Sequence, residues 1–301
     1  MIKISVITSL YNCSKYLPGY FEAVEKIPNK EECEFLLLHN APQTDEIEII
    51  NRNIGGKAWF RYIVIKQQEG LYVTWNRGVS MSKGEYCAVW NVDDIRFPDS
   101  LYLQAKILDE NKKCGLVTGY VNGTDVYGEL GNRFYKHDIM IKDPLEVFRS
   151  CLVGCFPMWR KSVHETIGYF DEQFICVSDF DFQIRVAMHF EFRCVPQSLG
   201  TYLENDPNKI SSNRAQGIEN NLIYIRYGAY ENIILHKMPA SLKRYNKNAL
   251  INFGKTYDLK NEMPFNFRHR IEGVGIAILR WPIHIARDIY HIMYPRFRTV
   301  I

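Results

Sequence analysis

The chain has 301 residues, 47% hydrophobic and 24% charged, and a formal net charge of +3 at pH 7. A chain of this size and composition buries a large core, which excludes extensive disorder. Its eight cysteines are scattered without a Cys-x-x-Cys pair, which favours free thiols and a cytoplasmic protein over a disulfide-bonded secreted one. Because no signal-peptide pattern and no apolar run of 18 residues occur, we expect a soluble or peripheral protein.

Strands alternate with helices over roughly the first 120 residues. This alternation predicts an α/β chain with a mostly parallel sheet that helices cover on both faces. The residue patterns give, in chain order, a strand at 2–7, a helix at 15–26, a strand at 34–38, a helix at 44–53, a strand at 62–65, a helix at 71–81, a strand ending at 93, a helix at 98–111 and a strand at 115–119.

The later part of the chain has a different pattern. Residues from Tyr120 to about Pro144 lose clear periodicity and contain three glycines, as a binding segment would. After Glu204 the chain reads as helical, and residues 236–301 contain twelve Lys and Arg against four Asp and Glu. We therefore expect a catalytic domain at 1–212 and a helical, basic extension at 213–301.

The first acidic cluster is the run Asn91-Val92-Asp93-Asp94, which follows an apolar strand. Open α/β sheets bind their ligands at the carboxyl ends of strands, and residues two apart on a strand share one face. Hard oxygen ligands in this position suit Mg²⁺ or Mn²⁺, which keep positions open for phosphate oxygens. The alternative is that Asp93 and Asp94 only begin a turn and cap the next helix.

The second acidic cluster, Asp179 and Asp181, opens a helix-like run at 179–190. Asp179 either faces a cleft as a general base or only caps this helix. Asp181 lies four residues before Arg185, a spacing that favours an ion pair on a helix.

Four groups of residues occur in a fixed order over roughly residues 1–205: Val6–Asn12; Asn76–Gly78 with Gly84–Tyr86; Asn91–Asp94 with Pro98–Leu101; and Gly168–Asp171 with Asp179–Asp181. Their order and spacing resemble the family 2 glycosyltransferases of the GT-A fold, a Rossmann-like architecture. The resemblance implies an enzyme that transfers a sugar from a nucleotide-diphosphate-sugar donor. The donor we expect is a UDP-sugar.

The resemblance also implies where the donor binds. The loop after the first strand would hold the base and ribose, with Tyr11 offering an aromatic face. Asn40 stands where the family usually has an acidic residue near the base, and its amide both donates and accepts hydrogen bonds. The donor-binding residues expected in this way are Thr8, Ser9, Tyr11, Asn12, Asn40, Trp75, Asn76, Asn91, Val92 and Asp93.

The family's metal and base motifs map onto the two acidic clusters. Asn91-Val92-Asp93 corresponds to the family's Asp-x-Asp and makes Asp93 the ligand of Mn²⁺ or Mg²⁺. The Ser178-Asp179 pair corresponds to Glu-Asp and makes Asp179 the catalytic base of an inverting displacement. The Gln-x-x-Arg-Trp motif of the processive polymerases is missing from this sequence, so we expect transfer of a single sugar to a saccharide or lipid-linked saccharide, in surface polysaccharide synthesis.

Two questions stay open at this level. Asn40, Asn91 and Ser178 stand at usually acidic positions, so a non-catalytic nucleotide-sugar or glycan binding module is the alternative function. The basic, amphipathic run 271–294 either lies on an anionic membrane surface, as at the inner membrane face, or packs on the catalytic domain or a second subunit. No nucleic-acid motif accompanies it, so we expect no nucleic-acid partner.

Overall fold

The computed structural model describes residues 2–136, 140–141, 147, 151–206, 209–210, 215–227 and 244–259. Contacts divide the chain into two units. The first consists of Met1–Gln216 and Leu250–Tyr257, and the second of Gly217–Ala249 and Asp258–Ile301. The residues of both acidic clusters belong to the first unit.

Within the described residues, the first unit holds a ten-stranded sheet with the order β3-β2-β1-β4-β9-β6-β10-β5; β7 pairs with β6 and β8 with β10. The strands are β1 (Ile4–Leu10), β2 (Cys33–Asn40), β3 (Phe60–Ile65), β4 (Tyr86–Val89), β5 (Ile95–Arg96), β6 (Cys114–Thr124), β7 (Arg133–Tyr135), β8 (Met140–Ile141), β9 (Met158–Arg160) and β10 (Glu191–Leu203). The helices are α1 (Leu17–Glu25), α2 (Thr44–Ile54), α3 (Leu71–Met81), α4 (Ser100–Glu110), α5 (Val163–Ile167), α6 (Ser178–His189) and α7 (Ala215–Arg226), with a 3-10 turn η1 (Lys30–Glu32).

The sheet is parallel in the half that carries the first motifs. β1 pairs in parallel with β2 on one side and β4 on the other, and β2 pairs in parallel with β3. β9 then runs antiparallel between β4 and β6, while β6 and β10 are again parallel. After β1 and after the neighbouring strand β4, the chain therefore continues toward opposite edges of the sheet. Such a position is a topological switch point, where open α/β sheets bind ligands. The predicted α/β sheet with flanking helices is confirmed.

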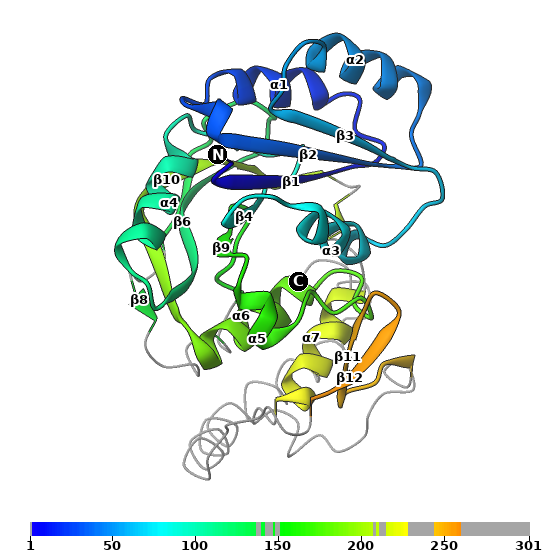
Figure 1. Ribbon diagram of the computed structural model, residues 1–301, viewed down its shortest axis with the longest axis vertical. Coiled ribbons are helices and arrows are strands. Elements are labelled where there is room, and N and C mark those ends of the chain that lie inside the picture. The colour runs from blue at the N-terminus through cyan, green and yellow to red at the C-terminus, as the bar shows by residue number, and fades with distance from the viewer. Residues whose placement is uncertain are drawn as a thin grey trace, which may run out of the picture. The chain divides into compact units, whose positions relative to one another are not determined.

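Alternate residues of β1 pack on opposite faces of the sheet, as the period of two requires. Val6 belongs to the core cluster that contains Tyr20 and Phe21 of α1. Ile7 points the other way, toward α3. Figure 1 shows α1 and α2 on one face of β1–β3 and α3 on the other.

Two glycines of the sequence motifs allow close approach between elements. A Cβ at Gly78 would lie 2.7 Å from Ile7 Cγ2 and 2.8 Å from Leu38 Cδ1, so α3 sits directly on β1 and β2. A Cβ at Gly84 would lie 2.7 Å from the backbone nitrogen of Ser5. A larger residue at Gly84 would require movement of the backbone, and one at Gly78 would require the Ile7 and Leu38 side chains to shift.

Most predicted elements form close to their predicted bounds, and α3 covers 71–81 as expected. Several strands differ from their predicted bounds. β1 ends at Leu10 instead of 7, and β6 extends to Thr124, beyond the predicted end at 119. β4 ends at Val89 instead of 93, so the prediction that Asn91 and Asp93 share one face of this strand is wrong. The chain turns there, and the Asp94 N–H donates to the Asn91 carbonyl oxygen at 3.1 Å.

β5, β7, β8, β9 and β10 were not predicted. In β10, Pro196 interrupts the pattern, and the register against β6 shifts between Val195 and Ser198, where a proline is tolerated at a bulge.

The region after Glu204 is not helical throughout. α7 is a helix, but β11 (Ala249–Asn252) and β12 (Lys255–Asp258) form a two-stranded sheet, so the prediction of helix is wrong for these residues. Phe253 and Gly254 connect them with φ values of 51° and 69°, the positive values that a two-residue hairpin turn requires. Within the second unit, Tyr245 donates to Glu219 Oε1 at 2.6 Å and Arg226 to the Ala249 carbonyl at 3.0 Å.

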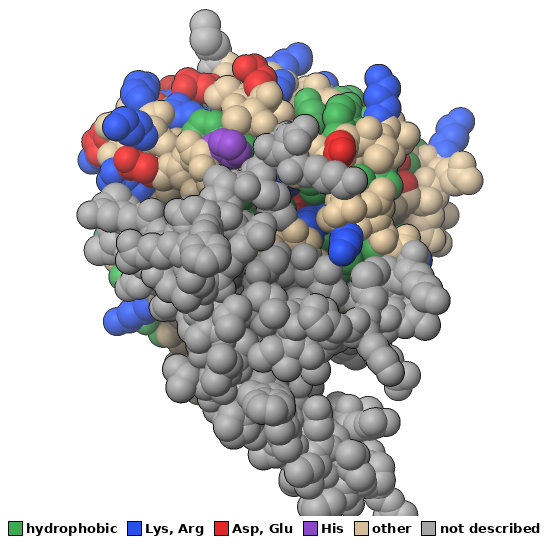
Figure 2. Space-filling view, turned by 90° about the horizontal axis from the view of Figure 1, so that it is seen from below, with side chains coloured by type: hydrophobic (Ala, Val, Ile, Leu, Met, Phe, Trp, Pro, Cys, Tyr) green, Lys and Arg blue, Asp and Glu red, His purple; other side chains and the backbone are tan. Residues whose placement is uncertain are grey.

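None of the helices in the described ranges has the length and hydropathy needed to cross a bilayer. On the face drawn in Figure 2, the described basic and acidic side chains are mixed. The basic run 271–294, for which we predicted contact with a membrane or a subunit, lies outside the described residues.

Candidate active site

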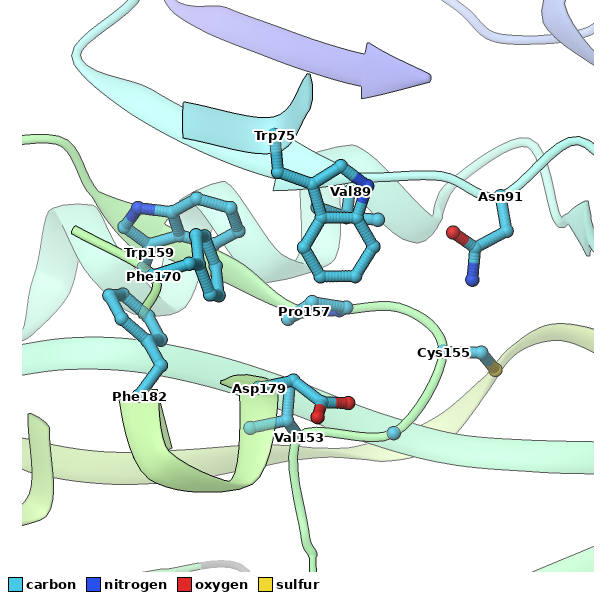
Figure 3. A pocket seen from close by; sticks show the side chains of 11 residues that line it. Trp75, Val89, Asn91, Val153, Cys155, Pro157, Trp159, Phe170, Asp179 and Phe182 are labelled. Atoms are coloured by element: carbon cyan, nitrogen blue, oxygen red, sulfur yellow. The ribbon is translucent and has the colours of Figure 1, made fainter. Parts of the chain in front are cut away.

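A cavity of about 50 Å³ lies between the carboxyl end of β4 and the start of α6. Asn91 and Asp179 both line it, and Figure 3 shows their amide and carboxylate groups directed into it. The cavity therefore brings together one residue from each of the two sequence-distant acidic clusters. Its apolar walls are Val89, Val153, Pro157, Trp159, Phe170 and Phe182.

Asp179 is held from two directions. Its Oδ1 accepts a hydrogen bond from the Phe180 backbone N–H at 2.9 Å, in the first turn of α6, and another from the Tyr72 hydroxyl at 3.3 Å. Burial and the negative charge of Asp179 raise the pKa of Tyr72 well above its usual value, so this tyrosine remains a donor. Asp179 thus lies in the first turn of α6, whose N-cap is Val177, and faces the cavity.

Asp181 is not among the residues that line the cavity; it pairs with Arg185, which fixes α6 to the preceding loop. Arg185 Nε donates to Asp181 Oδ2 at 2.8 Å, and both side chains are fully buried, which confirms the predicted ion pair. The same guanidinium donates to the carbonyl oxygens of Ile167 at 2.5 Å and Tyr169 at 2.8 Å. This ion pair therefore sets the position at which α6 delivers Asp179.

The two aspartates after β4 differ in environment. Asp94 is buried and accepts a hydrogen bond from the Leu203 N–H at 3.2 Å, which ties this turn to the end of β10. Asp93 is partly buried and is not among the residues that line the cavity. Burial raises the pKa of Asp93, although the positive charges of Lys209 and Lys15 act in the opposite direction.

The raised pKa means that nearby lysines do not fully compensate the burial of the Asp93 carboxylate, so further positive charge is favourable there. Among the described residues, no group of three or more His, Cys, Asp or Glu side chains is placed to hold a metal ion by itself. Magnesium in phosphate sites usually takes one or two carboxylates and completes its coordination with water and phosphate oxygens. A single carboxylate at Asp93 therefore fits a metal that binds together with a diphosphate.

The residues predicted to hold the nucleotide fall into two groups. Tyr11 is 50% exposed and Asn12 is exposed with a φ of 48°, so both lie open after β1, and Ser9 is partly buried. Thr8 is fully buried, with its hydroxyl 2.8 Å from the Tyr20 hydroxyl. Val92 is also buried, and its carbonyl oxygen accepts a hydrogen bond from Tyr127 at 3.3 Å.

Three further predicted residues lie along or near α3. Asn40 donates to the Glu69 carbonyl oxygen at 2.7 Å and accepts from the Glu69 N–H at 3.0 Å, so its amide fixes the loop before α3. Trp75 lines the cavity. Asn76 is fully buried and binds the backbone of Phe170 and the carboxylate of Glu172, so it contributes to the cavity through its Phe170 wall.

Sequence reasoning missed a buried network behind the loop after β1. Glu46 accepts hydrogen bonds from the Cys13 N–H at 2.5 Å and the Gln43 N–H at 3.1 Å, and lies 2.9 Å from His39 Nε2. His39 Nδ1 lies 2.8 Å from the Tyr62 hydroxyl. Gln43 and Glu46 form a capping box at the start of α2, and this three-residue spacing was the available signal in the sequence.

The comparisons with known proteins agree with this geometry. Residues 5–168 match the family model described as glycosyl transferase family 2. The uncharacterized glycosyltransferase MJ1057 of Methanocaldococcus jannaschii is 27% identical over 222 residues, which cover 71% of this chain and 75% of that protein. The uncharacterized glycosyltransferase RP339 of Rickettsia prowazekii is 24% identical over 186 residues, which cover 59% of this chain and 56% of that protein.

Solved structures show the same fold at low sequence identity. The S. aureus TarS fragment 1-349 in complex with UDP-GlcNAc has a TM-score of 0.63 and 16% identity, over 74% of this chain and 66% of that one. The mannosyltransferase PcManGT from Pyrobaculum calidifontis, in complex with GDP-Man and Mn²⁺, has a TM-score of 0.52 and 12% identity, over 74% of this chain and 61% of that one. The chain thus spans slightly less than two thirds of these solved chains. With a family model that matches more than half of its residues and a GT-A fold around the cavity, the chain is a glycosyltransferase and belongs to glycosyl transferase family 2.

Proposed function

We propose that the chain transfers one sugar from a nucleotide-diphosphate-sugar to a hydroxyl group of a saccharide or lipid-linked saccharide. The proposed donor is a UDP-sugar, and the transfer inverts the anomeric carbon. The observation that carries the proposal is the cavity shared by Asn91 and Asp179 beside the switch point of the sheet. The TarS complex with UDP-GlcNAc supports a uridine donor, and the PcManGT complex with GDP-Man makes guanosine donors the comparison to test.

In the proposed reaction, Asp179 accepts the proton of the acceptor hydroxyl while the hydroxyl oxygen forms a bond to the anomeric carbon. The bond from that carbon to the diphosphate oxygen breaks, and the diphosphate leaves with the electron pair. Tyr72 and the Phe180 N–H keep the Asp179 carboxylate in one place. The apolar walls of the cavity limit water at the reacting carbon, which favours transfer over hydrolysis.

The donor's nucleotide is proposed to lie along the ends of β1 and β4. The exposed ring of Tyr11 would stack on the base, and Asn12 is open to contact the nucleoside. Asp93 would hold Mn²⁺ or Mg²⁺, and the bound ion would supply charge neutralisation for the departing diphosphate. We place the reaction in surface polysaccharide synthesis at the cytoplasmic side of the membrane, the setting that the family resemblance suggested.

The test is nucleotide release from a panel of UDP-sugars and GDP-sugars in the presence of Mn²⁺, with and without oligosaccharide acceptors. The Asp93→Ala variant should release nucleotide at least ~10²-fold more slowly, because a metal supplies several kcal/mol of charge stabilisation. The Asp99→Ala variant, which removes an exposed aspartate at the start of α4, is the matched control and should retain the parent rate.

Each result discriminates between functions. Donor binding without turnover across the whole panel would favour the non-catalytic binding module. Release that continues unchanged in Asp93→Ala would show that this carboxylate does not hold the metal.

A further inference from the structure

Trp75 carries a buried donor that the described structure does not satisfy. Its side chain is 6% exposed, and its Nε1 has no hydrogen-bond partner among the described residues. An indole N–H donates and cannot accept, so only an acceptor atom satisfies it. A buried donor without a partner is costly, and such groups often mark a place that a ligand completes.

The indole is fixed by its neighbours. Its ring packs edge-on against Tyr72, with centroids 5.2 Å apart and planes at 89°, and against Phe170 at 5.3 Å and 72°. Phe170 is in turn held by Asn76. The direction of the N–H is therefore set before any ligand arrives, and Figure 3 shows the nitrogen edge of the ring on the side of Asn91.

The surroundings define the chemistry of the missing acceptor. Trp75 shares the cavity with the Asp179 carboxylate, whose negative charge opposes a phosphate group in the same small space. Apart from Asp179, Asn91 and Cys155, the side chains that surround it are apolar. A cavity of about 50 Å³ has room for a few hydroxyl-sized groups. The acceptor that fits is a neutral oxygen carried on a partly apolar body, which describes one edge of a sugar ring.

We propose that the Trp75 N–H donates a hydrogen bond to an oxygen of the transferred sugar and thereby selects among nucleotide-sugar donors. This proposal rests on the proposed function and adds a residue that determines specificity for the sugar. Binding sites that donate to a substrate oxygen discriminate strongly against analogues without it, because the site group is then left unpaired.

The test measures dissociation constants by calorimetry for UDP, for the best UDP-sugar of the panel and for its singly deoxygenated analogues. The parent protein should bind one analogue about 10-fold or more weakly than the full sugar, the range expected for one buried hydrogen bond. Trp75→Phe should bind the full sugar about as weakly as the parent binds that analogue, should no longer distinguish the two, and should bind UDP with the parent affinity.

Two further proteins make the test specific. Placing benzothienylalanine at position 75 replaces the N–H by sulfur at nearly constant shape, so it should reproduce the lost discrimination even if Trp75→Phe disturbs the packing. Trp59 also has a buried Nε1 without a hydrogen-bond partner among the described residues, but it does not line the cavity. Trp59→Phe should therefore keep the parent discrimination.

Unchanged discrimination in both position-75 proteins would overturn the proposal while the proposed function stands. An equal loss of affinity for UDP and for the UDP-sugar would also overturn it, because it would place Trp75 at the nucleotide. If the parent protein binds no nucleotide-sugar of the panel, the proposed function fails, and the proposal about Trp75 fails with it.

Discussion

Asn76 of α3 binds both backbone polar groups of Phe170. Its Nδ2 donates to the Phe170 carbonyl oxygen at 2.8 Å, and its Oδ1 accepts from the Phe170 N–H at 3.0 Å. Asn252 donates to the same carbonyl oxygen at 2.7 Å. Asn76 thus connects two motifs that are distant in sequence, and since Phe170 forms a wall of the cavity, both amides hold that wall in place.

Replacing Asn76 by alanine should destabilise the protein. The change removes three hydrogen bonds of a fully buried amide, including one to Glu172, and leaves the Phe170 N–H without that partner. We expect a loss of about 2–4 kcal/mol in the free energy of unfolding, measured by urea denaturation. Asn53→Ala removes one hydrogen bond, to Ile49 at 2.8 Å on α2, and should lose about 1 kcal/mol or less. Equal losses in the two variants would show that the Phe170 contacts contribute no special stability.

Replacing Tyr72 by phenylalanine should slow sugar transfer with little effect on donor affinity. The hydroxyl of Tyr72 donates to the Asp179 carboxylate at 3.3 Å, and a hydrogen bond to a charged group contributes about 10-fold or more. We expect kcat to fall by about that factor. Tyr86→Phe is the matched control, because Tyr86 also donates to an aspartate, Asp109 at 2.7 Å, but at the other end of β4. If kcat for Tyr72→Phe equals that of Tyr86→Phe, the Tyr72 hydroxyl does not help Asp179 act as the base.

The Glu46 network should matter for nucleotide binding and not for the chemical step. Burial favours the neutral acid at Glu46, yet hydrogen bonds from Cys13, His39 and Gln43 hold its pKa below the usual value. Glu46→Gln replaces a carboxylate, which only accepts, by an amide that has one accepting oxygen and one donating nitrogen. The amide cannot accept all the hydrogen bonds that the carboxylate accepts, so the loop that carries Tyr11 and Asn12 should become less ordered. We expect the Kd for UDP to rise about 10-fold, measured by calorimetry, with kcat at saturating donor unchanged. Glu48→Gln, at an exposed position of the same helix, should leave the Kd unchanged.

Stability should depend on pH through His164. Burial lowers the pKa of His164 to about 3; its Nε2 accepts from Trp159 Nε1 at 2.8 Å and its Nδ1 lies 2.9 Å from the Gly168 carbonyl oxygen. The unfolded chain takes up a proton near pH 6.5 that the folded chain does not, so stability falls as the pH decreases from 6.5 toward 3.

The slope from this one group approaches about 1.4 kcal/mol per pH unit below pH 6. It is measured by urea denaturation between pH 6.5 and 5, above the range where most carboxylates titrate. His164→Gln should remove this part of the slope, whatever it does to stability at pH 7. A variant with the same slope as the parent would mean that His164 accepts its proton in the folded state.

The first half of the fold was predictable because its signals are local. β1 to β4 and the helices between them are set by apolar runs and helical spacing. The close contacts at Gly78 and Gly84 were found only in the structure. β10 was not predictable in this way, since its pairing with β6 crosses a bulge near Pro196 and depends on tertiary contacts. The hairpin at 249–258 depends on the φ values of Phe253 and Gly254, and the Phe-Gly pair is a weaker turn signal than Asn-Gly.

The site was predictable only in outline. The sequence pointed to the run after β4 and to the start of α6, and the structure brings Asn91 and Asp179 to one cavity, whereas Asp93, the predicted metal ligand, does not line it. The orientation of each side chain was beyond sequence reasoning, because it follows from packing. Asn76 and Trp75 are neighbours on α3, yet one is fully buried against Phe170 and the other lines the cavity. No sequence pattern pointed to Tyr72 as a site residue, because its role depends on the hydrogen bond to Asp179, which only the folded structure shows.

The most direct test of the central claim is the transfer rate of Asp179→Asn, measured in single turnover with donor and acceptor saturating, beside the Kd for the donor. An amide cannot accept the acceptor's proton, so the account predicts a rate at least ~10²-fold below the parent's with the donor Kd nearly unchanged. A transfer rate equal to the parent's would contradict the account, because it would mean that the carboxylate in the cavity is not the base.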